Sequence, residues 1–405
     1  MALLTFDTRH KPRQAYVSMA ALLILMLVFP FVASQYGNSW VRIIDIALLY
    51  IMLALGLNIV VGFAGLLDLG YIAFFAVGAY LVGLFSSPQF AALLESLIYY
   101  SPALGEALVA FFGPEVAQDG IHLSLWAIVP LAALCAALCG ALLGAPTLKL
   151  RGDYLAIVTL GFGEIIRIFL NNLNDPINFT NGPQGINMID PIRVFGVSLA
   201  GEPGSNATVM IGDYAMPSVN AYYFLFLAMV IATIFITSRL QHSRLGRAWV
   251  AIREDEIAAK AMGINTRNVK LLAFAMGASF GGVAGAMFGA FQGFVSPESF
   301  SLTESIAVLA MVVLGGIGHI PGVVLGGVLL AALPEVLRHV VDPAQQMLFG
   351  KVIIEAEVLR QLLYGLALVG IMLVRPGGLW PSPNKEERPN AALAREEEEE
   401  ASGAR

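Results

Sequence analysis

Long apolar runs separated by shorter polar segments dominate the sequence. A helix that crosses the hydrocarbon core of a bilayer needs roughly 20 predominantly apolar residues. Eight runs have this character, at about residues 15–33, 43–61, 71–86, 123–143, 154–172, 220–238, 271–292 and 358–374. The pattern predicts an all-α fold, a polytopic transmembrane helix bundle.

A ninth apolar region, 305–337, is interrupted by the motif GGIGHIPG at 315–322. We interpret it as two short spans, which gives about ten spans, including broken or short helices, and puts both termini on one side. The alternative is one broken helix with a re-entrant segment. The first run follows Arg9, Lys11 and Arg13 as a signal peptide would. It is too long for a signal core and no Ala-x-Ala site follows, so we expect an uncleaved span.

Composition agrees with a membrane protein. Hydrophobic residues make up 58% of the chain and charged residues 13%, against about 25% charged residues in soluble domains. The lipid bilayer is therefore an expected partner. The net charge of −6, without a basic stripe, argues against a nucleic-acid partner. The run Glu396–Glu400 predicts that 375–405 is a disordered acidic cytoplasmic tail.

Lysine and arginine define the predicted orientation, because cytoplasmic loops are enriched in both. With the N-terminus inside, twelve fall on the inner segments 1–14, 144–153 and 239–270. Only two fall on the outer segments 34–42, 87–122, 174–219 and 294–304. We therefore predict that both termini are cytoplasmic. The predicted parts are a cytoplasmic N-terminal segment 1–14, a transmembrane permease domain 15–374 with inner coupling loop 239–270 and outer loops 87–122 and 174–219, and the tail.

The sequence offers no enzyme site. Cys135 and Cys139 lie in an apolar run as small packing residues, the five histidines are scattered, and neither a metal site nor a cofactor motif is predicted. A P-loop around Lys351 would need glycine and serine or threonine where Gln345 and Val352 stand. If ATP drives this protein, it is hydrolysed on another chain.

Glycines recur every fourth residue in the run 271–292, at Gly277, Gly281, Gly285 and Gly289. They form one smooth helix face that neighbouring backbones can approach closely. Two interpretations remain open, helices that rock against each other and static close packing.

A second glycine-rich segment, 62–70, interrupts an apolar region and contains Asp68. Unwound backbone in a membrane is tolerated where protein or water surrounds it, and in transporters it lines substrate paths. A tight turn is the alternative. Glu164 and Arg167 share a helix face and can pair, as part of a polar path or as a structural ion pair. The candidate path residues are Asn58, Gly62, Gly65, Asp68, Glu164 and Arg167; Asp45 and Glu304 also lie within or beside spans.

The inner loop carries a predicted amphipathic helix over 251–262, with Gly263 at its C′ position. Such a helix suits docking into a partner's groove. Its Ala258-Ala259-xxx-Gly263 pattern resembles the EAA coupling loop of ABC importer permeases, although Glu256 comes one residue early and Ile257 takes the usual glutamate position. The resemblance implies a set of residues that couple to an ATPase, namely Arg253, Glu254, Asp255, Glu256, Ala258, Ala259 and Gly263.

Four further motifs resemble the LivH/LivM permease family and occur in the family's order. They are LNIVVGFAGLLDLG at 57–70, GDYLAIVTL at 152–160, TNGPQGI at 180–186 and GGIG at 315–318. The resemblance covers about residues 40–375, and GDYLAIVTLGFGEI resembles the LivM-like branch.

The resemblance implies a permease subunit of an ATP-driven, binding-protein-dependent importer of leucine, isoleucine and valine in a bacterial inner membrane. It implies two ABC ATPase subunits, a LivH-like sister permease and a soluble extracytoplasmic amino-acid-binding protein as partners. One alternative is a urea or short-chain amide permease of the same architecture. The other is an ion-coupled secondary transporter or channel, with Asp45, Asp68 and Glu164 as ion sites.

Overall fold

The computed structural model describes residues 26–380 except 36, 148, 149, 151, 195, 201–207, 212, 213, 350–355 and 376. The predicted segment 1–14, the first part of the first span and the tail beyond residue 380 lie outside the described residues.

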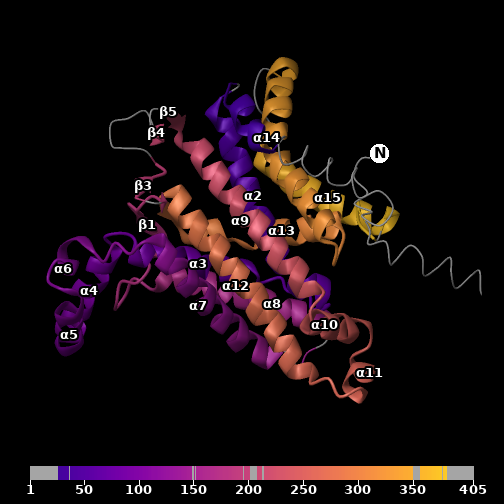
Figure 1. Cartoon of the computed structure of the whole chain (residues 1–405), viewed down its shortest axis with the longest axis horizontal. Helices are drawn as coiled ribbons and strands as arrows, with labels where there is room; N and C mark the ends of the chain where they lie inside the picture. The colour runs from indigo at the N-terminus through magenta and orange to yellow at the C-terminus, as the bar shows by residue number, and fades with distance from the viewer. Residues whose placement is uncertain are drawn as a thin grey trace, which may run out of the picture.

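Helices dominate the described part of the chain, and most of the long ones run side by side (Figure 1). After a helix at Met26–Gln35 come α2 (Asn38–Asn58), the π-helix η1 (Ile59–Phe63), α3 (Ile72–Phe85), α4 (Gln89–Tyr100), α5 (Pro102–Phe112), α6 (Val116–Asp119), α7 (Leu125–Thr147), α8 (Asp153–Asn172), α9 (Ser218–Gln241), α10 (Arg244–Glu254), α11 (Glu256–Ala261), α12 (Thr266–Gln292), α13 (Leu302–Gly315), α14 (Ile320–Phe349) and α15 (Ala356–Val374).

The described helices confirm a polytopic membrane bundle. Four helical segments, Asn38–Phe63, Leu125–Thr147, Ser218–Gln241 and Thr266–Gln292, are long and apolar enough to cross a bilayer, and the pair α3 and α4, bent by 81°, brings the number to five. The other predicted spans contain shorter apolar segments, among them Leu302–Gly315, Ile320–Pro334 and Val358–Val374, or correspond to α8, a helix that carries three charged residues. The region 305–337 forms the two helices α13 and α14 rather than one.

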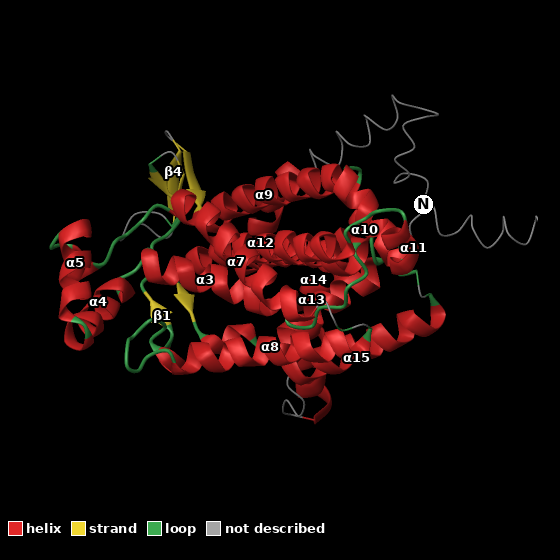
Figure 2. Ribbon diagram, turned by 90° about the horizontal axis from the view of Figure 1, so that it is seen from below, coloured by secondary structure: helices red, strands yellow, loops and turns green. Residues whose placement is uncertain are grey.

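The core lies around α2 and α12. In α2 and η1 89% of the apolar stretch is buried, whereas in α7 the value is 28%, so the described part of the chain leaves most of the α7 surface uncovered. α12 packs against α7, α3 and α2, and Figure 2 shows it inside the bundle beside α7.

The glycine face of α12 lies close to the backbones of neighbouring helices. A Cβ at Gly285 would overlap the carbonyl oxygen of Phe75 in α3, and one at Gly289 would lie 3.2 Å from Ala79 O. Near the other end of this face, a Cβ at Gly277 would lie 3.1 Å from Gly56 O in α2, and a Cβ at Gly281 would lie 3.2 Å from the Cβ of Phe74. This packing fits both interpretations of the glycine face.

The predicted outer loops are structured. Segment 87–122 contains α4, α5 and α6, which close around the buried side chains of Phe90, Leu93, Leu94 and Val116. Segment 174–219 contains the 3-10 helix η2 (Gly182–Gln184) and five short strands, β1 (Ile186–Asn187), β2 (Arg193–Val194), β3 (Val197–Ser198), β4 (Thr208–Ile211) and β5 (Tyr214–Pro217). β2 pairs with β3 and β4 with β5, while β1 pairs with β6 (Phe294–Val295), just after α12; all three pairs are antiparallel. The 3-10 helix η3 (Pro297–Phe300) follows β6.

Candidate functional site

The predicted unwound segment is present and begins inside the membrane-spanning helix α2. The α-helical hydrogen-bond pattern ends at Asn58, widens to a π-helix over 59–63, and gives way to irregular backbone that reaches Gly70. Leu66 N donates to Val60 O (3.0 Å), and Gly65 has the left-handed φ of +69° that glycine tolerates. Most of the segment is buried, whereas Gly65 is exposed and Leu67 and Leu69 are half-buried; irregular backbone at membrane depth is tolerated where protein or water surrounds it.

This break in α2 contacts a second break, the turn between α13 and α14. The side-chain oxygen Oδ1 of Asn58 accepts a hydrogen bond from Gly318 N (2.9 Å). A Cβ at Gly62 would overlap Asn58 Oδ1 and lie 2.8 Å from Gly318 N, so glycine at position 62 is required for this contact. Two sequence motifs far apart in the chain thus form one junction.

The far end of the unwound segment is held by α8 and α13. Asp68 Oδ1 accepts from Gly70 N (2.9 Å), Leu69 N donates to Thr159 Oγ1 (3.0 Å), and Ser305 Oγ donates to Leu69 O. The cavity beside Asp68 measures only about 10 Å³, which is about the space of one water. In this conformation the break is closed to a solute the size of an amino acid.

The predicted single helix over 251–262 is wrong, because Asp255 divides it. α10 ends at Glu254, and Asp255 Oδ1 caps α11 by accepting from Ile257 N (2.7 Å) and Ala258 N (3.0 Å). An aspartate competes with the helical backbone in this way and favours N-caps. Gly263 follows α11 with φ +85°, which confirms the predicted C′ glycine.

We call residues 244–263 the inner hairpin, and it is anchored to the bundle at three points. Arg253 Nη1 donates to Gly62 O, Trp249 Nε1 donates to Val269 O (2.8 Å), and Lys270 Nζ lies 2.7 Å from Glu256 Oε1. Trp249 is fully buried. The inner hairpin is therefore tied both to the start of α12 and to the break in α2.

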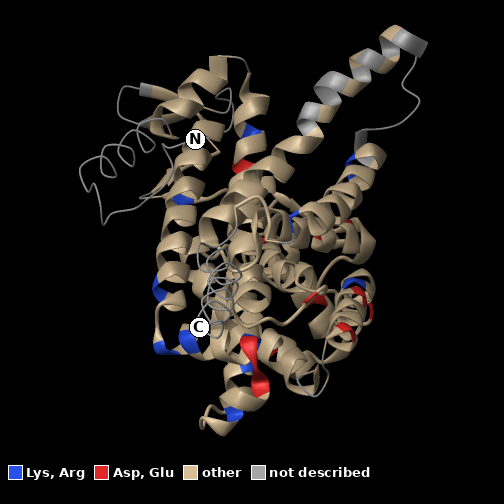
Figure 3. Cartoon of the chain, turned by 90° about the vertical axis from the view of Figure 1, so that its right-hand side faces the viewer, with Lys and Arg blue, Asp and Glu red and all other residues tan. Residues whose placement is uncertain are grey.

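The opposite side of the inner hairpin faces outward. Ile257 and Met262 are 73% and 84% exposed, and Ala258 is exposed beside them, whereas Ala259 is buried. Lysine, arginine, aspartate and glutamate residues are frequent in this part of the chain (Figure 3). Apolar side chains exposed among charges are typical of a surface that another protein covers.

The predicted pair on α8 is present. Arg167 Nε donates to Glu164 Oε2 (3.0 Å), and Arg167 Nη1 lies 4.0 Å from Glu298 Oε1, a residue that the sequence reasoning did not single out. Glu164 and Arg167 lie in the part of α8 beyond Thr159, so the structure does not gather all six candidate path residues in one place.

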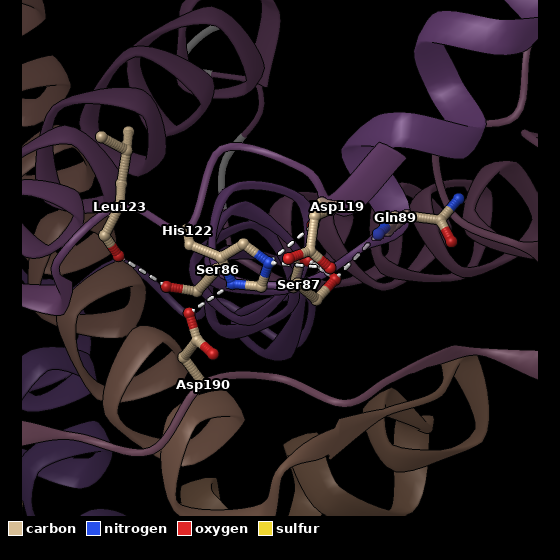
Figure 4. A network of polar contacts seen from close by, with 8 residues as sticks. Ser86, Ser87, Gln89, Asp119, His122, Leu123 and Asp190 are labelled. Atoms are coloured by element: carbon tan, nitrogen blue, oxygen red, sulfur yellow. Dashed lines mark hydrogen bonds and ion pairs between the residues drawn. The ribbon is translucent and has the colours of Figure 1, made fainter. Parts of the chain in front are cut away.

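Sequence reasoning also missed a polar junction at the end of the bundle opposite to the inner hairpin (Figure 4). His122 Nδ1 lies 2.6 Å from Asp190 Oδ2 and His122 Nε2 lies 2.5 Å from Asp119 O. Ser86 Oγ donates to Leu123 O (2.7 Å), and Asp190 N donates to Ser86 O (2.7 Å). The junction joins the helical segment 87–122 to the strand-containing segment 174–219. No short sequence motif predicts this contact, because His122 and Asp190 are 68 positions apart.

The His122 junction makes the outer segment pH-sensitive. The hydrogen bond to Asp190 raises the pKa of His122 above its ordinary value of 6.5, because both ring nitrogens face acceptors and only the imidazolium donates from both. The resulting stability is complete below the unfolded-state pKa and is lost as the pH rises through the folded-state pKa. After correction for intrinsic exchange, we expect amide hydrogen exchange over 113–124 to be severalfold faster at pH 9 than at pH 6.

His122→Gln should remove this pH dependence, and His242→Gln, at the other end of the bundle, should keep it. Equal exchange at both pH values in the unmodified protein would contradict the assignment.

The sequence is similar to a known family of transport proteins. Residues 39–373 match the family described as "Branched-chain amino acid transport system / permease component". The chain is 39% identical over 369 residues to the high-affinity branched-chain amino acid transport system permease protein LivM of Escherichia coli (strain K12), a match that covers 90% of this chain and 74% of that protein.

More distant relatives extend the comparison. LivM of Salmonella typhimurium is 38% identical over 89% of this chain and 74% of that protein. LivH of Escherichia coli (strain K12) is 43% identical over 105 residues, which cover 26% of this chain and 32% of that protein. No solved structure matches the chain.

Proposed function

Because the chain belongs to the branched-chain amino acid transport permease family, we propose that it is the LivM-like half of the membrane channel of an ATP-driven importer for leucine, isoleucine and valine. It is a multi-pass membrane protein and a transport subunit of an ABC system, in a family whose permeases lack an ATPase domain.

The proposed partners follow from what this subunit must do. Two ABC ATPases act from the cytoplasm, a LivH-like sister permease completes the path, and a soluble extracytoplasmic protein delivers the amino acid. The partial similarity to LivH supports two related permeases around a pseudo-two-fold axis. The asymmetry of lysine and arginine between the loops supports a bacterial inner-membrane orientation with both termini and the inner hairpin in the cytoplasm.

The contact between Arg253 and the Gly62 carbonyl is the observation that carries the proposed mechanism. In this mechanism, ATP binding closes the two ATPases, which press on the exposed side of the inner hairpin around Ala258. Arg253 transmits the displacement to the break in α2, where Asn58 and Gly318 meet. The helices then rearrange, and the closed break near Asp68 opens toward the cytoplasm.

Reconstitution tests the proposal. The permease pair should accumulate labelled leucine in proteoliposomes only when the ATPases, ATP and the binding protein are all present. Uptake of labelled urea instead of leucine would identify the amide-permease alternative. Leucine accumulation driven by an ion gradient without the ATPases would identify a secondary transporter and overturn the proposal.

We propose further that Glu164 and Arg167 form a polar stretch of the path. The shape-matched double variant Glu164→Gln/Arg167→Met removes both charges at once and leaves neither one unpaired. We expect the rate of leucine uptake to fall about tenfold, equivalent to about 1.4 kcal/mol at the barrier, with the yield of folded protein unchanged. Asp153→Asn, at the exposed start of the same helix, is the matched control. If uptake by the double variant is undiminished, the pair is structural only.

A further inference from the structure

The polar junction around His122 borders a cavity that the proposed mechanism does not use. The cavity measures about 310 Å³, at the lower end of the roughly 300–1,000 Å³ typical of small-molecule sites. It lies at the end of the bundle opposite to the inner hairpin, between the end of α3, the start of α7 and segment 174–219. The lining residues that define its chemistry are Asp119, His122, Leu123, Leu125, Asp190 and Arg193.

Two carboxylates border this cavity. Asp190 Oδ2 lies 2.6 Å from His122 Nδ1, and Asp119 Oδ1 lies 4.0 Å from His122 Nε2, so the two acids lie on either side of one imidazole ring (Figure 4). A carboxylate offers about four lone-pair positions. Within the described part of the chain no other side chain pairs with either carboxylate, which leaves acceptor positions for an ammonium group.

Arg193 brings the opposite charge to the same cavity. Its backbone is held in place, because its carbonyl oxygen accepts a hydrogen bond from Trp126 Nε1 of α7 (2.9 Å). Arg193 is exposed, and its side chain forms no hydrogen bond or ion pair among the described residues. The guanidinium presents five donors in a planar fork that fits a carboxylate. With His122 protonated, the two acidic and two basic side chains carry no net charge.

A free amino acid matches this arrangement better than a side chain of a partner protein does. An amino acid has both an ammonium group and a carboxylate, whereas a partner's side chain has one charge at most and would use only one of the two kinds of group. Leu123 and Leu125 add apolar surface to the cavity. A polar ligand side chain placed against the two leucines would lose its hydration without a new hydrogen bond, so an apolar amino acid is favoured.

We propose that this cavity is an entrance site that binds the zwitterion of an apolar amino acid. The ammonium group binds Asp119 and Asp190, and the carboxylate binds the Arg193 fork. The side chain packs against Leu123 and Leu125. A zwitterion has no net charge, so its binding leaves the charge balance of the cavity unchanged.

The inference rests on the proposed function, because the outer position of this cavity follows from the distribution of lysine and arginine. It adds that the permease holds the amino acid before the closed break near Asp68 opens. Asp119 and Arg193 are exposed, and ion pairs between exposed groups contribute little. The site is therefore weak, as suits a solute that must leave it again.

Binding of labelled leucine to the assembled importer, without its binding protein and without ATP, is the first test. Leucine should bind saturably. Leucinamide, which lacks the carboxylate, and 4-methylpentanoate, which lacks the ammonium group, should both displace it far less well than unlabelled leucine does. If either compound displaces leucine as well as leucine itself, the two charged ends are not recognised and the site is overturned.

Variants of the two charged walls locate the binding. Arg193→Gln should weaken leucine binding about tenfold, the effect of one lost charge-assisted contact, and Asp119→Asn should weaken it severalfold. Arg42→Gln, near the start of α2, and Glu115→Gln, four residues before Asp119, are the matched controls. Both control side chains are exposed and lie outside the lining of the cavity, so leucine binding should stay unchanged.

Protection of a reporter cysteine is the second test. Ser124 is exposed and borders the cavity. In a complex whose Cys135 and Cys139 are replaced by alanine, Ser124→Cys should react with a small methanethiosulfonate reagent. Leucine should slow this reaction, and Arg193→Gln should abolish most of the protection.

The outcomes separate this inference from the proposed function. If the unmodified importer shows no ATP-driven leucine uptake, the proposed function fails. If the importer works but leucine neither binds without the binding protein nor protects the reporter, the entrance site is overturned. In that case Arg193→Gln can still raise the concentration of loaded binding protein needed for half-maximal ATP hydrolysis, which would show that the cavity receives a side chain of that protein instead.

Discussion

Arg253→Gln is expected to reduce leucine uptake by the reconstituted importer by about ten- to a hundredfold, while the ATPases stay assembled on the permease and hydrolyse ATP. The Arg253 guanidinium donates to the Gly62 carbonyl, and the stem of the same side chain lies beside Gly65, where a Cβ would lie 2.5 Å from Arg253 Cγ. A hydrogen bond that involves a charged group contributes about 1.5–3 kcal/mol, which corresponds to the expected range of rates. The quantity to measure is the number of leucine molecules transported per ATP hydrolysed.

Arg247→Gln provides the matched control on the same helix. Arg247 is exposed and donates to the carbonyl of His242 (2.8 Å), which belongs to the turn just before α10. The Arg247→Gln substitution removes a hydrogen bond of the same type but leaves the contacts of the break in α2 unchanged. If the two variants transport the same amount of leucine per ATP, Arg253 does not transmit the motion of the inner hairpin.

Among single glycine-to-alanine substitutions in α12, Gly285→Ala is expected to produce the largest loss of folded protein. The new Cβ would overlap the Phe75 carbonyl oxygen, lie 2.8 Å from its carbonyl carbon and lie 3.0 Å from Ala79 N. All three atoms belong to the backbone of α3, so no side chain can rotate away and the two helices must separate. Overpacking of this kind costs about 1–3 kcal/mol and sometimes more. The yield of monodisperse protein and its thermal transition in detergent measure the effect.

A graded series makes this prediction specific. Gly289→Ala should be milder, because its nearest neighbour would be the Ala79 oxygen at 3.2 Å, and Gly161→Ala should have no cost, because no atom lies within 4 Å of its Cβ position. Equal stability of the Gly285 and Gly161 variants would show that α3 and α12 are not in close backbone contact.

The sequence predicts those features that depend on local pattern. Apolar run lengths predict the spans, the four-residue spacing from Gly277 to Gly289 predicts the smooth face, and the glycines from Gly62 to Gly70 predict the break in α2. Each of these three features depends on residues that are close together in the sequence. The structure has the helical bundle, with four or five of the spans long and apolar enough to cross a bilayer, and supplies the partners, Phe75 and Ala79 for the glycine face and Gly318 for the break.

Features that depend on tertiary packing or on a single cap were not predictable in the same way. Asp255 ends α10 because its carboxylate caps α11, although the propensity of the neighbouring residues favours one continuous helix. The contacts of His122 with Asp190 and of Glu304 with Arg360 join residues 68 and 56 positions apart. Neither pair has a local signature, because the fold alone decides which helices become neighbours.

The pairing of β1 with β6 has a consequence for communication across the membrane. α12 has 27 residues and is therefore about 40 Å long. The inner hairpin contacts the first turns of α12 through Trp249 and Lys270. Segment 174–219, which the sequence predicts to lie outside, is joined just beyond the other end of α12 through Ile186 and Val295. Because α12 is held at both ends, binding at one end can change the binding affinity at the other. The coupling free energy is the same in both directions. Under the proposed function, the factor by which ATP binding changes the affinity for the binding protein therefore equals the factor by which the binding protein changes the affinity for ATP.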